Sequence, residues 1–195
     1  MLLLGCLASL LFACQRSPQP EPATAEQAEM WPDSMQELRT LKVSNAEMGE
    51  LAKARQAGLS DRGSIVLIKL ARIRHKPFTE GRNIADLLSA GVSEKTVLAL
   101  ARLNQLGIWT GQAQALHLTG FSDQVLLAVA QRRSQGLPVL SGEKLAELKN
   151  AGASETEIID MIEKGFTKQQ ASSYIAGRQR AAGGNGFVYQ GHRQR

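Results

Sequence analysis

Cysteine is almost missing from this sequence, and no cysteine lies where a folded domain could use it. The chain of 195 residues has two, Cys6 and Cys14, both within its first 14 positions. The chain beyond Cys14 can therefore form neither a disulfide bond nor a metal site built from thiolate ligands.

Aromatic residues are also scarce, at 5% of the chain, and runs of β-branched residues are rare. Ala, Leu, Gln, Glu, Lys and Arg, which favour helices, dominate instead. No stretch alternates convincingly between apolar and polar residues with a period of two, so the sequence predicts no β-sheet. A chain of this length is sufficient for one domain with a real core. The expected fold class is all-α.

The first residues lack charge but not hydrophobicity. Residues 2–13 read LLLGCLASLLFA, which is too short to span a bilayer as a helix but has the length and composition of the apolar part of a secretory signal. Leu11-Phe12-Ala13-Cys14 resembles a bacterial lipobox, in which a small residue precedes a cysteine that becomes acylated. The resemblance implies a signal peptide over residues 1–13 and Cys14 as the lipidation site, with palmitate-like acyl chains.

Cys14 is favoured over two alternatives. Cys6 also follows a small residue, but apolar residues come after it, whereas the hydrophilic QRSPQPEP follows Cys14. The other alternative is a buried hydrophobic N-terminal helix with two unreactive cysteines.

Proline is confined mainly to one segment, since four of the six prolines lie in residues 14–34. That composition favours extended conformations and cannot form a core, so we expect a tether that carries the lipidated cysteine and spans up to ~60 Å. Residues 178–195 contain four arginines, a Gly-Gly-Asn-Gly run and no acid. They predict a basic disordered tail, which leaves residues 35–177 for a folded domain.

A repeat of 29–33 residues organises that domain. In each copy a small residue precedes a glycine, and an apolar residue and a serine follow it. Such spacings are typical of helical hairpins. The glycines are Gly58, Gly91, Gly120 and Gly152, and the serines are Ser60, Ser93, Ser122 and Ser154.

A glycine just past a helix end can take the left-handed conformation that closes the last turn, and a serine two residues later can cap the next helix. The pattern therefore predicts an array of about four helical hairpins, packed as a compact bundle or a short solenoid. A short helix near 34–42 precedes them, and a last helix runs to about Gly177. Residues 65–68 and 125–130 are apolar on most sides, so we expect them in the interior. The hairpins pair 45–57 with 61–75, 80–90 with 94–106, 110–118 with 123–135, and 142–151 with 155–164.

One of these turns also resembles a DNA-binding motif. Residues 90–97, AGVSEKTV, are similar to the turn of lactose-repressor-type helix-turn-helix domains, and the resemblance covers residues 84–103. That family has a small residue where this chain has Leu87, and residues 98–103 offer few side chains able to contact base edges. DNA binding is the alternative if the N-terminus is not exported.

Positive charge gathers in the first repeat, in a chain with a net charge of +5. Two interpretations stay open for this cluster, a solvated face or a docking patch for an anionic partner. On one helical face lie Arg62, Lys69, Arg72 and Lys76.

Signals of catalysis are weak. The three histidines lack metal-ligand spacing, and Ser141-Gly-Glu-Lys144 has the spacing of a penicillin-binding-type nucleophile motif without its companion motifs. We therefore predict no catalytic residue, no metal ligand and no cofactor; a peptidoglycan-acting hydrolase is the enzymatic alternative. The expected function is a non-enzymatic binding or scaffold lipoprotein of the cell envelope. It would face the periplasm from the outer membrane in a Gram-negative cell, with a protein or cell-wall component rather than nucleic acid as partner.

Overall fold

The computed structural model describes residues 30–183, except for the side chains of residues 108 and 109. The predicted signal sequence, Cys14 and most of the predicted tether lie outside these residues, as does the tail from residue 184. Between residues 30 and 183 the chain forms ten helices and no strand. The predicted all-α fold class is confirmed.

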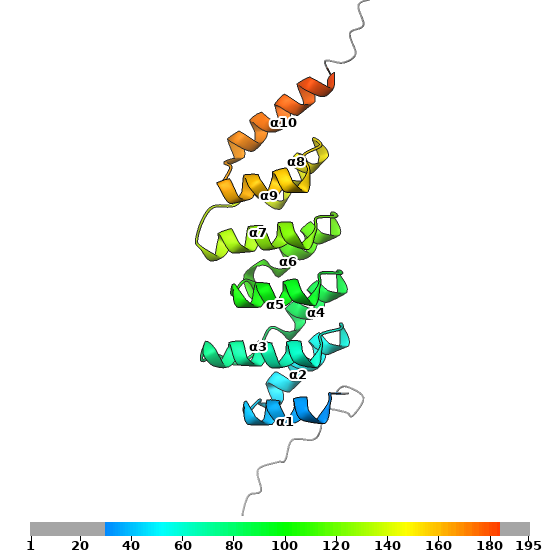
Figure 1. Ribbon diagram of the computed structural model, residues 1–195, viewed down its shortest axis with the longest axis vertical. Coiled ribbons are helices and arrows are strands. Elements are labelled where there is room, and N and C mark those ends of the chain that lie inside the picture. The colour runs from blue at the N-terminus through cyan, green and yellow to red at the C-terminus, as the bar shows by residue number, and fades with distance from the viewer. Residues whose placement is uncertain (1–29, 184–195) are drawn as a thin grey trace, which may run out of the picture.

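The helices form two layers, because each helix packs against the helix two places further along the chain. Four hairpins, α2–α3 to α8–α9, lie one above another in an elongated stack, with α1 at one end and α10 at the other (Figure 1). This arrangement is a short solenoid. The odd layer contains α1 (Pro32–Thr40), α3 (Asp61–Ile73), α5 (Glu94–Arg102), α7 (Asp123–Ser134) and α9 (Glu155–Lys164), and the even layer contains α2 (Asn45–Gln56), α4 (Gly81–Ser89), α6 (Leu106–Leu118), α8 (Gly142–Asn150) and α10 (Lys168–Gly183).

The four predicted turn glycines close helices as expected. All four have positive φ, between 84° and 104°. At the first of them the N–H of Leu59 donates to the carbonyl of Ala54 at 3.1 Å, and the N–H of Gly58 donates to Arg55 at 2.9 Å. This pair of bonds satisfies carbonyls that a helix end otherwise leaves free. The same two bonds recur at Gly91, Gly120 and Gly152.

Three further helix ends use the same closure without glycine. Lys42, His75 and Asn104 have φ between 52° and 57°, and the two closing bonds form around each of them. The left-handed conformation disfavours residues with a Cβ atom, asparagine least among them, and the glycine pattern did not predict these three closures.

Serine caps most of the predicted helices. The hydroxyl oxygens of Ser60, Ser93 and Ser154 accept from the backbone three residues later, at 3.0–3.3 Å. The prediction for Ser122 is wrong: its backbone is extended as a cap requires, but its hydroxyl makes no capping bond. The N–H of Val125 donates to the Ser122 carbonyl instead, at 3.1 Å.

Four helix ends differ most from the prediction. Helix α1 starts at Pro32, inside the predicted tether, because proline is well suited to the first helical turn. Helix α5 ends at Arg102 rather than at residue 106, so residues 103–105 form the turn. Helix α6 starts at Leu106, so residues 107–110 are helical rather than a connection. Helix α10 continues to Gly183, so residues 178–183 of the predicted tail are helical.

The main core lies between the two layers. Leu67 and Ile68 of α3 are buried there, as are the corresponding residues of α7. Ile65 and Val66, which were expected inside, are only half-buried and lie on the opposite side of α3. The prediction of an interior helix therefore holds for one side of α3. None of the helices between residues 30 and 183 combines the length and the apolar character needed to cross a membrane.

A pair of glycine substitutions tests how closely α2 and α4 pack. A Cβ atom on Gly81 would collide with the backbone of Glu50, whereas one on Gly49 would meet nothing within 4 Å. We expect Gly81→Ala to destabilise the protein by about 1–3 kcal/mol through overpacking. Gly49→Ala, within α2, should stabilise it by about 0.5–1 kcal/mol because alanine favours the helix. Urea unfolding of both variants measures the difference, and equal effects would contradict this packing.

Candidate functional site

Arg72, one of the four predicted patch residues, lies in a structural cluster at the first junction of the stack. Its guanidinium donates two hydrogen bonds to the carboxylate of Glu47, at 2.6 and 2.8 Å. It also donates to the carbonyls of Leu41 and Lys42, at 3.0 and 3.3 Å. Arg72 therefore closes the end of α1 while it pairs with α2.

Glu47 is the buried centre of this cluster, with a side chain that is 4% exposed. Besides Arg72, its carboxylate accepts from the backbone and hydroxyl of Ser44 and from the N–H of Phe78 at 3.0 Å. The Arg72 guanidinium, assisted by these donors, holds the pKa of the Glu47 carboxyl well below its usual range. The cluster joins α1, α2, α3 and the segment before α4.

A row of carboxylates links the N-terminal ends of the odd helices. The backbone N–H of Ser60 donates to Glu94 of the next odd helix at 3.2 Å, and its hydroxyl donates to the same carboxylate at 2.6 Å. In the same way Trp31 donates to Asp61, Ser93 to Asp123, and Ser122 to Glu155. Each acid is the first residue of its helix, where negative charge also suits the helix dipole. These acids therefore join neighbouring repeats.

At α9, the last odd helix, the row of carboxylates is completed in a different way. Ser154 donates to Glu157 of its own helix, at 2.8 and 3.0 Å. Glu157 in turn accepts from Tyr174 at 2.9 Å and from Arg178 at 2.5 Å, both on α10. These bonds, with that from the Ser154 backbone as the largest cause, lower the pKa of Glu157 to about 2. Helix α10 thus closes the end of the row.

Arginines take the corresponding place at the C-terminal ends of the odd helices. Arg74 donates to the last carbonyls of α5, at Ala101 and Arg102, and Arg132 donates to the carbonyl of Glu163 in α9 at 3.0 Å. Positive charge is favourable at these ends. Much of the positive charge in the sequence therefore has a structural role.

The four residues of the predicted basic patch do not form one free surface. Arg72 is committed to Glu47, and Lys69 forms an ion pair with Glu37 of α1 at 2.6 Å. Arg62 is exposed and forms no hydrogen bond or ion pair with any described residue. Lys76 lies beyond the end of α3, beside a cavity.

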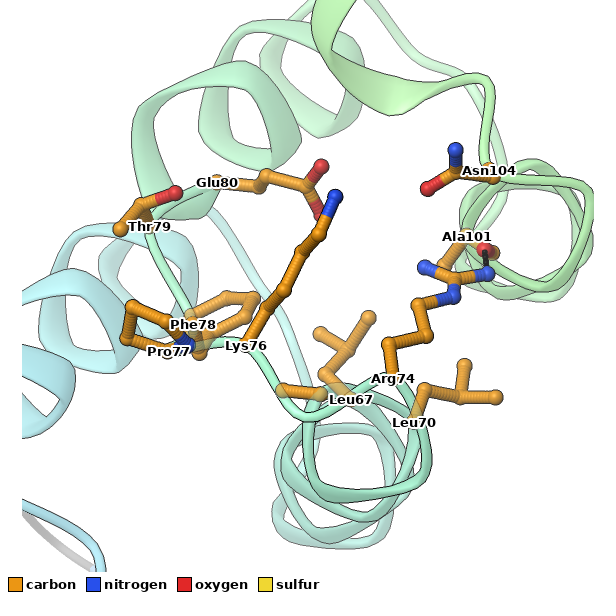
Figure 2. Close-up of a pocket in the computed structure, with 11 residues that line it drawn as sticks. Leu67, Leu70, Arg74, Lys76, Pro77, Phe78, Thr79, Glu80, Ala101 and Asn104 are labelled. Carbon is orange, nitrogen blue, oxygen red and sulfur yellow. Dashed lines mark hydrogen bonds between the residues drawn. The ribbon is translucent and has the colours of Figure 1, made fainter.

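That cavity, of about 240 Å³, lies between α3, α5 and the segment that leads into α4 (Figure 2). Figure 2 shows Lys76 and Glu80 converging on one side, and Arg74 and Asn104 on the other. Burial raises the pKa of Glu80, an effect that Arg74 and Lys76 oppose. The volume falls below the ~300 Å³ at which ligand pockets usually begin. It is sufficient for a few water molecules or a very small ligand.

The chain matches no protein family, no curated protein and no solved structure.

Two other groups singled out in the sequence have structural surroundings. Ser141 caps α8 by accepting from the backbone of Lys144 at 3.3 Å, while the Lys144 ammonium group pairs with Glu147. The His117 Nδ1 atom lies 3.6 Å from Asp123, too far for a hydrogen bond, and both atoms are buried without a partner among the described residues. Asp123 already belongs to the carboxylate row. Neither group assembles a nucleophile with a base.

The side of the odd layer that faces away from the even layer has a regular pattern of exposure. On each of α3, α5, α7 and α9, residues four and eleven places after the turn glycine are exposed, and the residue seven places after it is half-buried. We call these residues the outer face. It comprises Arg62, Ile65, Val66 and Lys69 on α3; Lys95, Leu98, Ala99 and Arg102 on α5; Gln124, Leu127, Ala128 and Gln131 on α7; and Thr156, Ile159, Asp160 and Glu163 on α9.

Sequence reasoning missed half of the basic part of this face. Lys95 and Arg102 take the same places after Gly91 that Arg62 and Lys69 take after Gly58. Comparing the repeats position by position would have found them, because the repeat brings equivalent residues to the same side of the stack.

Proposed function

We propose that this chain is a non-enzymatic binding module whose outer face docks a partner with acidic groups. The observation that carries the proposal is the set of four exposed basic residues on α3 and α5, beside half-buried apolar side chains and with no acid among the outer-face positions of these two helices. Stacked helical repeats commonly use such extended surfaces for binding. The partner class is an acidic protein or cell-wall component.

We further propose that the module is held at the cell envelope by an acylated Cys14. The proposal is supported by the apolar segment of residues 2–13 and the hydrophilic, proline-containing sequence that follows the cysteine. Stable anchoring requires more than one acyl chain, since each buried methylene contributes only ~0.8 kcal/mol.

The position of α5 favours protein docking over DNA binding. A recognition helix must enter the major groove, which requires a protruding helix. Helix α5 packs between α3 and α7 within the same layer, and Thr96, Val97 and Leu100 are buried. The basic residues that remain exposed on α5 lie on the outer face, where an extended partner can reach them.

Labelling cells with a fatty-acid analogue tests the anchor. We expect the protein to carry the label and to fractionate with membranes, and Cys14→Ser to abolish both properties. Cys6→Ser is the matched control and should leave the label in place. A chain that remains unlabelled and cytoplasmic would contradict the anchor and revive the DNA-binding alternative.

The docking face is tested by photo-crosslinking in intact cells. A crosslinking amino acid at Lys95 or Arg102 should capture a partner, whereas one at exposed Arg82 on α4 should not. Equal capture from both layers would contradict docking at the outer face. Activity on purified cell wall that a single Glu→Gln change removes would establish the hydrolase alternative instead.

A further inference from the structure

The outer face changes charge in steps along the stack. On α3 and on α5, the residues four and eleven places after the turn glycine are both basic. On α7, the residues at these two places are both glutamine. On α9 they are Thr156 and Glu163, and Asp160 adds a second carboxylate. Half-buried apolar residues run along the middle of the face, at Ile65, Leu98, Leu127 and Ile159. The face therefore has a basic half, an acidic end and an apolar stripe that connects them.

We propose that the partner whose acidic groups meet the outer face is a second copy of this chain, bound with the opposite stacking order. The inference rests on the proposed function, since it names the partner of the same face. A two-fold axis parallel to the helices, between α5 and α7, would place α3 on α9 of the partner and α5 on its α7. A two-fold interface uses the same surface twice and must therefore be complementary to itself.

The charges of the outer face are complementary to themselves only when the two copies have opposite stacking orders. In the reversed order Lys69 lies opposite Glu163 of the partner subunit, and Arg62 is within reach of Asp160 of the partner subunit. The same-order arrangement would place α3 on α3, with its lysine and arginine facing each other, and like charges across an interface are costly.

The apolar stripe fits the same arrangement. Reversal places Ile65 opposite Ile159 of the partner subunit, and Leu98 opposite Leu127 of the partner subunit. Ile73, in the last turn of α3, is 73% exposed. A solvated face gains nothing from these side chains, whereas a covered face gains about 25 cal/mol for each Å² that it buries.

Two ion pairs within the chain already involve these charges. Lys69 contacts Glu37 at 2.6 Å and Lys164 contacts Asp160 at 2.8 Å, and all four side chains are at least 41% exposed. Exposed pairs of this kind contribute little to stability. They can therefore be exchanged for pairs within an interface, which excludes solvent from both partners.

Cysteine crosslinking of the full chain tests the order. In a background with Cys6→Ser and Cys14→Ser, which also removes any acyl chain, Ile65→Cys and Ile159→Cys chains are prepared separately. Under mild oxidation their mixture should form a crosslinked dimer, and so should a mixture of Leu98→Cys and Leu127→Cys chains. Ile65→Cys alone and Ile159→Cys alone should not crosslink, because each symmetry mate lies towards the opposite end of the stack. Leu98 and Leu127 lie next to the axis, so their mixture should crosslink faster than either variant alone. Crosslinking of Ile65→Cys to itself, or a monomer at every concentration, would overturn the proposal.

Charge reversal supplies a second test by sedimentation velocity. Lys69→Glu and Glu163→Lys should each weaken dimerisation by at least about tenfold, since each change disrupts two symmetry-related pairs. Combined in one chain they should restore it, because the reversed charges face each other. Arg82→Glu, on the other layer, is the control and should change nothing. Double-variant chains that stay as weak as the single variants would count against the pairing.

The outcomes separate this inference from the proposed function. If the chain stays monomeric but Lys95 captures another acidic protein in cells, the docking face stands and the second copy is wrong. If the dimer forms as described and Lys95 captures only this chain, both stand. If no partner of either kind is captured and no dimer forms, both fail.

Discussion

Arg72→Ala is expected to destabilise the protein by about 3–5 kcal/mol, because it leaves the Glu47 carboxylate buried without its countercharge. The side chain of Glu47 is 4% exposed, so water that enters the space left by the 32% exposed Arg72 side chain can replace the guanidinium only in part. The variant also frees the carbonyls of Leu41 and Lys42 at the end of α1. Chemical denaturation of the purified chain measures the loss.

Arg62→Ala is the matched control, since Arg62 lies on the same helix and is exposed. Its effect should remain within about 0.5 kcal/mol. A double change, Glu47→Gln with Arg72→Met, should recover part of the loss, because it removes both charges while an amide oxygen still accepts from Phe78. An Arg72→Ala variant as stable as Arg62→Ala would show that the cluster contributes nothing to stability.

The pH dependence of stability follows from the same carboxylate. The pKa of Glu47 in the folded chain lies below its ordinary value of 4.5, and that of Glu157 is lowered to about 2. A lowered pKa means that the stabilisation is complete above about pH 4.5 and is lost as the pH falls further. The normal chain should therefore lose stability between pH 5 and pH 3, and Arg72→Ala should lose less over the same range because its main pKa-lowering group is gone.

The fold was predictable to the extent that it depends on local rules. Glycine after a helix and serine before the next one are short-range signals, and they placed the turns at Gly58, Gly91, Gly120 and Gly152. The closures at Lys42 and His75 were missed because lysine and histidine give no signal for a left-handed backbone. The closure at Asn104 was missed because only glycines were considered, although asparagine also adopts this conformation. Ser122 failed as a cap although its backbone has the required geometry.

The candidate site was less predictable, because a helical face does not show which neighbour it meets. Arg62 and Arg72 lie on the same helix, yet one is exposed and the other closes the end of α1. The carboxylate row was also hidden, because the helix dipole alone accounts for an acid in the first turn of a helix, as at Glu94 and Glu155. The apolar run of residues 65–68 on α3 indicated an interior helix, but Ile65 and Val66 lie half-buried on the outer face.

Phe121→Ala is expected to destabilise the middle of the stack by about 3–5 kcal/mol, since a large buried side chain is removed and leaves a cavity. Phe121 is 1% exposed and follows the turn glycine between α6 and α7. The ammonium group of Lys149 on α8 lies 4.6 Å from the centre of the Phe121 ring in a cation–π contact. The variant therefore also removes a contact with α8.

The equivalent residue of the last turn, Phe166, supplies the control because it is only half-buried. Phe166→Ala should lower the free energy of unfolding by less than half as much as Phe121→Ala does. In a stack where each repeat contacts its neighbours alone, damage at Phe121 should separate the two halves rather than unfold them together. Amide hydrogen exchange should therefore show protection lost first in α6–α8 and retained longer in α2–α4. Uniform loss of protection along the whole chain would mean that the stack unfolds as a single cooperative unit.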